Sequence, residues 1–209
     1  MMTQTREWVL TILSFSARLC VSYGAVAAML LLWPVLRATQ LLIPLWPAVP
    51  RYTVPPWLDT RSAWQIVLLG GEVVSPFTTA EVSHLQDVHH VIVVAFAVVL
   101  GATGVFTWVH WYAGYTKAVL VRESQLLTVA WRVLVLLTLL AVAFFSSFFT
   151  VFHQVFFPQG NWAFPADSRL LLTFPVPFWV QNLVLLQAGV VFLLRWQAAQ
   201  LRSANLPKL

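Results

Sequence analysis

The chain has 209 residues, of which 60% are hydrophobic and 9% are charged, whereas soluble domains carry roughly 45–50% apolar and about 25% charged residues. A soluble domain of this size cannot bury so much apolar surface, so this composition excludes a soluble globular protein and a disordered chain. The formal net charge is +5, but the basic residues are scattered singly and form no block that would follow a phosphate backbone. We therefore expect a membrane protein with no nucleic-acid partner.

Four apolar windows are long enough to cross a membrane, since a helix needs about 20 residues to span the hydrocarbon core. They cover residues 9–33, 91–109, 133–152 and 178–194. Only the first contains a charge, Arg18, which we expect to extend toward the headgroups. The sequence therefore predicts an all-α integral membrane protein, with residues 1–209 forming a single membrane domain of four transmembrane helices.

A cleaved signal peptide is a competing interpretation of the first window, because Arg6 precedes it and Ala25-Val26-Ala27 resembles a cleavage site. The apolar run continues past that point to Trp33, and Arg18 interrupts the segment that would form the apolar core of a signal peptide. We therefore favour a retained membrane helix.

The distribution of Lys and Arg predicts the orientation. With both termini and the 110–132 connection on one side, that side carries seven basic and two acidic residues, against four basic and five acidic on the other. Both termini should then be cytoplasmic, with connections 34–88 and 153–177 outside. These connections are long and apolar, so we expect them to form an extracytoplasmic cap. The prolines from Pro34 to Pro56 should prevent regular helix early in the first connection.

Four of the five histidines fall at the predicted outer ends of the second and third windows: His84, His89, His90 and His153. Because the two windows are consecutive, we expect His84 and His153 to converge at the outer surface. If residues 78–88 are helical, Glu81, His84 and Asp87 follow one another at i,i+3 spacing, and Asp87 can fix the tautomer of His84. Glu81 has a second interpretation, since Thr78-x-x-Glu81 fits a capping box.

Three chemistries suit such a histidine pair. His84, Asp87 and His153 could supply three metal ligands, and His90 with His153 could hold a haem. The third is metal-free acid–base catalysis of acyl transfer. No Gly-x-Ser-x-Gly motif is present and Cys20 lies within a predicted span, so the nucleophile would come from the substrate. A non-catalytic membrane partner and a haem- or metal-binding redox protein remain open alternatives.

Two stretches carry a resemblance to a known family. Residues 81–88 read Glu-Val-Ser-His-Leu-Gln-Asp-Val, and residues 152–158 read Phe-His-Gln-Val-Phe-Phe-Pro, followed by Asn161-Trp162 and by Ser168. Together they resemble the two motifs of the bacterial lipoprotein intramolecular transacylases, which are four-span membrane proteins. Many members of that family carry Asp where this chain has Ser168.

The resemblance implies an acyltransferase of the bacterial cell membrane that needs no metal or cofactor. It would move the sn-2 acyl chain of a diacylglyceryl lipoprotein to the α-amine of the lipoprotein's own N-terminal cysteine, giving the lyso-form. Its partners would be this diacylated lipoprotein and membrane lipid. The expected catalytic residues are His84, His153 and Asp87. The expected substrate-binding residues are Glu81, Asn161, Trp162 and Ser168.

Overall fold

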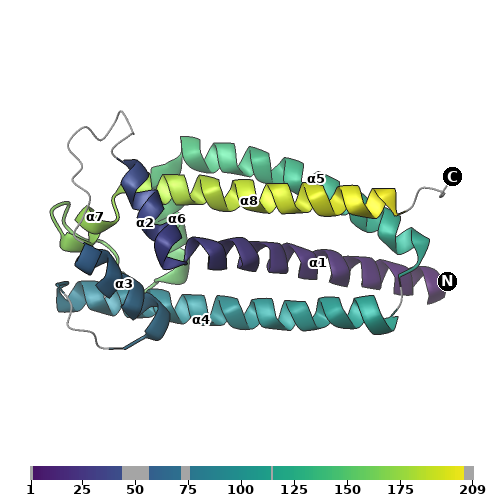
Figure 1. Cartoon of the computed structure of the whole chain (residues 1–209), viewed down its shortest axis with the longest axis horizontal. Coiled ribbons are helices and arrows are strands. Elements are labelled where there is room, and N and C mark those ends of the chain that lie inside the picture. Colours follow the sequence, from purple (N-terminus) through teal and green to yellow (C-terminus); the bar gives the residue numbers. More distant parts are fainter. Residues whose placement is uncertain (1, 44–56, 72–75, 114, 205–209) are drawn as a thin grey trace. The chain divides into compact units, whose positions relative to one another are not determined.

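A computed structural model describes residues 2–43, 57–71, 76–113 and 115–204, and within them it contains helices and no strand. Figure 1 shows the helices in chain order: α1 (Met2–Leu30), α2 (Trp33–Leu42), α3 (Trp57–Leu69), α4 (Thr79–Trp108), a π-helix η2 (Val109–Ala113), α5 (Lys117–Ala143), α6 (Phe145–Phe156), α7 (Arg169–Thr173) and α8 (Val176–Ser203). The prolines from Pro44 to Pro56 lie outside the described residues, as do Arg51, Glu72 and Lys208.

Four segments are long and apolar enough to cross a membrane: Gln4–Leu30, Thr79–Trp111, Lys117–Ala143 and Val176–Ser203. The predicted all-α architecture with four spanning helices is thereby confirmed by length and composition. The helices differ in extent from the apolar windows. The third window, 133–152, runs from α5 into α6 past Phe144, where the backbone leaves helical geometry with φ −115° and ψ 40°.

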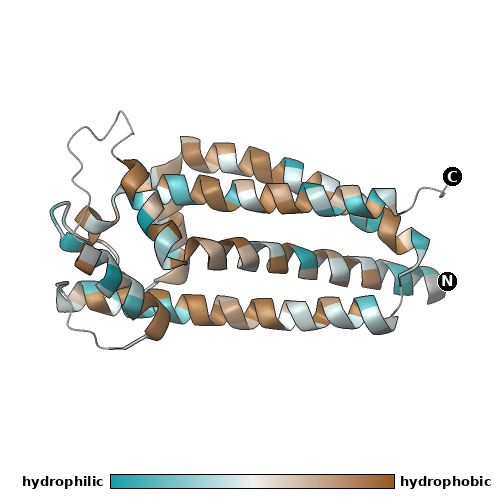
Figure 2. Cartoon of the chain, viewed as in Figure 1, coloured by the Kyte–Doolittle hydropathy of each residue, from teal (hydrophilic) through white to brown (hydrophobic). Residues whose placement is uncertain are grey.

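Large apolar side chains are exposed on the faces of the long helices. Val94 and Leu100 on α4 are 63% and 74% exposed, and Leu139 on α5 is 64% exposed. Figure 2 shows hydrophobic residues along most of α4 and α5. In water such surface would cause association, whereas a lipid environment accommodates it at no cost.

The chain divides into two compact units, and the first consists of Met1–Ala28, Phe96–Leu139 and Leu185–Leu209. Small residues let its helices approach closely. A Cβ added to Gly24 would lie 2.6 Å from the Val99 side chain, and one added to Gly189 would lie 2.8 Å from Val26. Small residues at such contacts are the usual means by which membrane helices pack, because lipid removes the hydrophobic drive for association.

A buried ion pair lies inside this first unit. Arg18 Nε donates to Glu123 Oε1 over 2.7 Å, and Ser14 Oγ donates to the same oxygen over 2.5 Å. Glu123 is fully buried, and the Arg18 guanidinium also lies 4.6 Å from the Phe106 ring. The prediction that Arg18 extends to the headgroups is therefore wrong, because a buried carboxylate and an aromatic face hold it within the helices.

The second unit consists of Met29–Ala95 and Leu140–Val184. Its apolar core joins α2, α3, α4, α7 and α8 through Ile43, Ala63, Ile66, Phe77, Leu85, Leu170, Phe174 and Phe178. Helix α2 contains Pro34 in its first turn, so this proline starts a helix where we expected it to prevent one. The first turn tolerates proline because an amide there has no intrahelical partner.

The end of α3 is fixed by a glycine packed against a histidine. Gly70 has φ +69°, and its N–H donates to the Ile66 carbonyl over 2.9 Å. His89 Nδ1 lies 2.9 Å from the Val67 carbonyl oxygen. A Cβ added to Gly70 would lie 2.5 Å from His89 Nε2. Both the left-handed backbone and the close ring therefore require glycine at this position.

We expect Gly70→Ala to destabilise the protein, because the left-handed conformation costs an alanine about 1–2 kcal/mol and the added methyl group must displace His89. Gly71→Ala is the matched control, since a Cβ at Gly71 would meet no atom within 4 Å among the described residues. Thermal unfolding in detergent should give a clearly lower midpoint for Gly70→Ala than for Gly71→Ala. Equal midpoints would contradict this account of the α3 end.

Candidate active site

Two histidines from different helices lie beside each other in the second unit. His84 is on α4 and His153 is on α6, and their ring centroids are 5.9 Å apart with the planes tilted by 31°. Both residues are buried, with 6% and 8% of their surface exposed. The structure thus brings together the pair that the sequence singled out.

Aromatic rings surround this pair. The Phe157 ring lies 4.8 Å from that of His84, and the Trp162 ring lies 5.0 Å from that of His153, both measured between centroids. Phe149 stacks on His153 at 3.9 Å. The segment after α6 reaches these positions by turning at Gly160, which has φ +80°. Such a wall limits water around the imidazoles and suits the hydrocarbon of an acyl chain.

The hydrogen bonds define the state of the His153 ring. Its Nδ1 lies 2.8 Å from the Phe149 carbonyl oxygen, and a carbonyl oxygen only accepts, so Nδ1 carries the hydrogen. Nε2 therefore holds the lone pair when the ring is neutral. Burial lowers the pKa of His153 below its usual value, and the bond to Phe149 opposes part of this shift. His153 is thus an imidazole base with one nitrogen available.

His84 differs in its polar contacts. Its Nδ1 atom is buried and has no hydrogen-bond partner among the residues that the structure describes. A buried nitrogen without a partner costs free energy unless another molecule supplies one. His84 is thus able to form a hydrogen bond with a bound substrate.

Asp87 contacts the segment that follows α6. Its Oδ2 accepts hydrogen bonds from Gln159 Nε2 over 2.9 Å and from Asn161 Nδ2 over 2.5 Å. Within the described part of the chain, no hydrogen bond joins Asp87 to His84, so the expected orienting bond is not seen. Gln159 was not predicted, although it stands between Pro158 and Gly160, where a turn exposes polar groups to neighbouring elements.

The expected substrate-binding residues Glu81 and Ser168 make contacts within the protein. Glu81 is 2% exposed; its Oε2 accepts from Thr78 N and Oγ1, while Oε1 accepts from Leu170 N over 2.7 Å. Ser168 Oγ accepts from Leu171 N over 3.3 Å and caps α7. The contacts of Glu81 Oε2 with Thr78 are those of a capping box. The second oxygen, Oε1, holds the start of α7 against α4.

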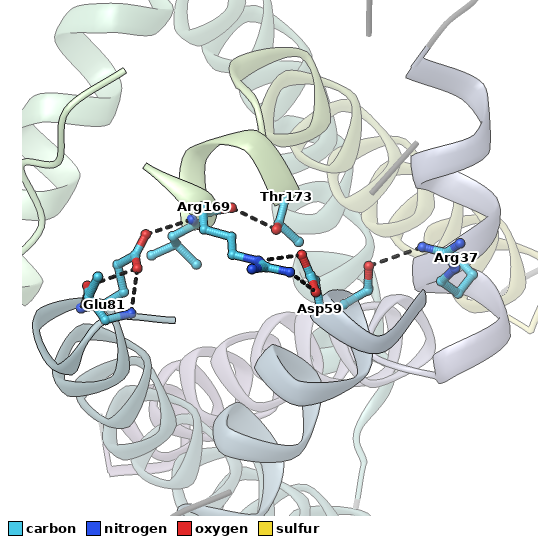
Figure 3. Close-up of polar contacts among 8 residues, drawn as sticks. Arg37, Asp59, Glu81, Arg169 and Thr173 are labelled. Atoms are coloured by element: carbon cyan, nitrogen blue, oxygen red, sulfur yellow. Dashed lines mark hydrogen bonds and ion pairs between the residues drawn. The ribbon is translucent and has the colours of Figure 1, made fainter. Parts of the chain in front are cut away.

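Figure 3 shows that further charged residues continue this network. Arg169 donates from Nε and Nη2 to the two carboxylate oxygens of Asp59 over 2.8 and 3.0 Å, which links α7 to α3. Gln40 on α2 donates to the Thr173 carbonyl over 3.1 Å. Helix α7 is therefore held by α2, α3 and α4, and it follows directly the segment that carries Asn161 and Trp162.

The structure also bears on the metal and haem alternatives. Among the described residues, no group of three or more His, Cys, Asp or Glu side chains is arranged to hold a metal ion. His90 is exposed, and its ring contacts that of His89 with centroids 5.7 Å apart. The imidazole that lies beside His153 is that of His84, with ring centroids 5.9 Å apart.

Comparisons with known proteins identify a family and a similar fold. The family model described as "Lipoprotein intramolecular transacylase Lit" matches residues 56–179, more than half of the chain. A solved structure of the membrane-integral lipoprotein intramolecular transacylase Lit from Bacillus cereus has 14% sequence identity and a TM-score of 0.69 over 95% of this chain and 93% of that chain. At this identity the likeness concerns the fold. No curated protein sequence matches the chain.

Proposed function

Because the chain belongs to the lipoprotein intramolecular transacylase family, we propose that it moves the sn-2 acyl chain of a diacylglyceryl lipoprotein to the α-amine of the same molecule's N-terminal cysteine. The product is the lyso-form lipoprotein. The observation that carries this proposal is the pair of buried imidazoles 5.9 Å apart between aromatic rings. The protein is a multi-pass membrane protein, and we assign its site to the extracytoplasmic face with both termini cytoplasmic.

His153 acts as the base in this proposal, and its bond to Phe149 supports the assignment because that bond leaves Nε2 unprotonated. Nε2 takes one proton from the cysteine ammonium. The resulting amine attacks the ester carbonyl carbon, forming the C–N bond and an oxyanion. His84 gives a proton to the glycerol oxygen as the C–O bond breaks, and takes the second proton from the nitrogen, which becomes the amide. The proton on His153 then passes to water.

The remaining expected residues have supporting roles. We propose that the Trp162 indole N–H donates to the oxyanion, because its ring lies beside His153. Glu81 and Ser168 are positioning residues: they hold the start of α7 and thereby the preceding segment, which carries Asn161 and Trp162. No protein nucleophile and no metal or cofactor enters these steps. Since amine and ester belong to one molecule, alignment alone can supply an effective molarity on the order of 10⁵ M or more.

The proposed function is tested with the purified protein in liposomes that contain a synthetic diacylated lipopeptide. Mass spectrometry of the peptide N-terminus should show transfer of one acyl chain to the cysteine nitrogen, with no change in total mass. Absence of product from the protein alone would instead support a non-catalytic membrane partner. A Soret band or stoichiometric metal in the purified protein would support the redox alternative.

The pH dependence of the rate follows from the lowered pKa of His153. A base with a lowered pKa stays neutral further into the acidic range, so the rate should hold as the pH falls to about 6.5, the ordinary histidine value, and decline only below it. Values of kcat/KM, obtained from initial rates between acidic and neutral pH, measure this decline. A decline centred at a pH above the ordinary histidine pKa would contradict the role of His153 as the base.

A further inference from the structure

Within the described residues, hydrogen bonds reach the Asp87 carboxylate at one of its two oxygens. Gln159 and Asn161 both donate to Oδ2, over 2.9 and 2.5 Å. None of the residues that the structure describes donates a hydrogen bond to Oδ1. Two neutral amides fix the orientation of this carboxylate, and they leave its negative charge without a cationic partner in the contacts described.

Asn161 offers a second acceptor beside this carboxylate. Its Nδ2 is bonded to Asp87, while its Oδ1 is buried and meets the geometry of a hydrogen bond with none of the described residues. The Asn161 side chain also interacts with the neighbouring His84 ring. Because one amide group carries both atoms, the empty acceptor lies next to the carboxylate. The site therefore lacks a donor with a positive charge and more than one N–H, which is the description of a primary ammonium.

His84 lies beside this position, and His153 lies beside His84. His84 lies one helical turn before Asp87 on α4, a spacing at which side chains are neighbours. Asn161 directly precedes Trp162, whose ring centroid is 5.0 Å from that of His153. A cation bound between Asp87 and Asn161 would thus lie next to the imidazoles that the proposed reaction uses.

We propose that Asp87 Oδ1 and Asn161 Oδ1 form the binding site for the α-ammonium group of the substrate's N-terminal cysteine. This inference rests on the proposed function, in which that ammonium is the source of the nucleophile. An α-amino group has a pKa of about 7.7–8.0, so the substrate amine is mostly protonated at neutral pH. It therefore supplies a positively charged partner for the carboxylate. In this role Asp87 touches the substrate directly.

The site also explains how substrate and product are distinguished. After transfer, the cysteine nitrogen is an amide with no charge and a single N–H, so it loses the ionic attraction to the carboxylate and can donate only one neutral hydrogen bond. The product therefore binds more weakly than the substrate at this position, which favours its release. Lipoproteins whose amine is already acylated should be poor ligands for the same reason.

Equilibrium binding of unreactive analogues tests the site without turnover. The probes are a dialkyl ether lipopeptide with a free α-amine, which has no ester to transfer, and its deamino counterpart, which lacks the amine and adds no bulk. The wild-type protein in nanodiscs should bind the free-amine probe on the order of 10-fold to 100-fold more tightly, as charge-assisted hydrogen bonds imply. Equal binding of the two probes would overturn the proposal.

Two variants test whether Asp87 causes the preference for the free-amine probe. Asp87→Asn keeps the size of the side chain and removes its charge, so it should bind both probes about equally. Asp167→Asn is the matched control, because Asp167 is an exposed acidic residue between α6 and α7, and it should keep the wild-type preference. Retention of that preference in a folded Asp87→Asn protein, verified by its thermal midpoint, would refute the ammonium site.

The same samples separate this inference from the proposed function. If the wild-type protein prefers the free-amine probe but transfers no acyl chain in a diacylated lipopeptide, the transacylase proposal fails and the ammonium site stands. If it transfers the chain but shows no preference between probes, the ammonium site fails and the transacylase proposal stands.

Discussion

His153→Asn should lower the transacylation rate about 10²-fold to 10⁴-fold, the range that a positioned general acid or base contributes. The asparagine amide nitrogen takes the place of Nδ1 and can still donate to the Phe149 carbonyl, which His153 Nδ1 contacts at 2.8 Å. Only Nε2 is lost. The substitution therefore removes the proposed base and preserves the local hydrogen bond, and lyso-form lipopeptide measured by mass spectrometry reports the rate.

The control is His110→Asn, since His110 lies in the π-helix Val109–Ala113 of the first unit and has no part in the proposed reaction. It should retain the wild-type rate. If His84 and His153 act as one unit, His84→Gln combined with His153→Asn should be little worse than either alone. A folded His153→Asn protein with the wild-type rate would remove this residue from the mechanism.

Glu123→Leu should lower the free energy of unfolding by about 3–5 kcal/mol, the usual cost of removing one partner from a buried ion pair. The substitution leaves Arg18, whose side chain is 15% exposed, without the carboxylate that it contacts at 2.7 Å. It also removes the acceptor of Ser14. Denaturant unfolding in mixed micelles measures the loss.

The double variant Arg18→Met/Glu123→Leu is the matched control, because it removes both charges and keeps the volume of the side chains. Replacing a buried pair by apolar residues is often neutral or stabilising, so the double variant should recover most of the stability. A double variant as unstable as Glu123→Leu would show that the charge of Arg18 is not the cause of the loss.

The helices and the histidine pair were predictable from local patterns. Apolar runs of spanning length identify α1, α4, α5 and α8, since only helices satisfy their own backbone groups in lipid. His84 precedes the second apolar window and His153 follows the third, so chain direction alone brings them to one surface. Helix α3 could also have been found, because it follows Pro55-Pro56 and precedes Gly70-Gly71.

The bonds of the polar network that join different helices could not be predicted, because they connect distant parts of the chain. Asp59 and Arg169 are 110 residues apart, and Glu81 is 89 residues from Leu170. A carboxylate can accept a hydrogen bond from the first turn of a distant helix, or it can bind substrate. No local sequence pattern distinguishes these two roles. Arg18 is similar, since extension to the headgroups is the default in the absence of a known partner, and Glu123 lies 105 residues further on.

Ser168 illustrates how a departure from a motif can leave its role intact. Its hydroxyl caps α7 by accepting from Leu171 N. Asp, the residue that the resemblance leads us to expect at this position, caps helices about as well as Ser. We therefore expect both residues to begin α7 in the same way, and the substitution alone does not point to a different substrate.

A crossover experiment with doubly labelled substrates shows whether the acyl chain moves within one lipopeptide molecule. One lipopeptide carries a heavy sn-2 acyl chain on a light peptide, and a second carries a light chain on a heavy peptide. Both are supplied together to the purified protein in liposomes. We predict that every N-acylated peptide carries the chain from its own glycerol, in heavy–light and light–heavy products only. Heavy–heavy and light–light products would show transfer between molecules, and no N-acylated product would show that this histidine pair does not catalyse the transfer.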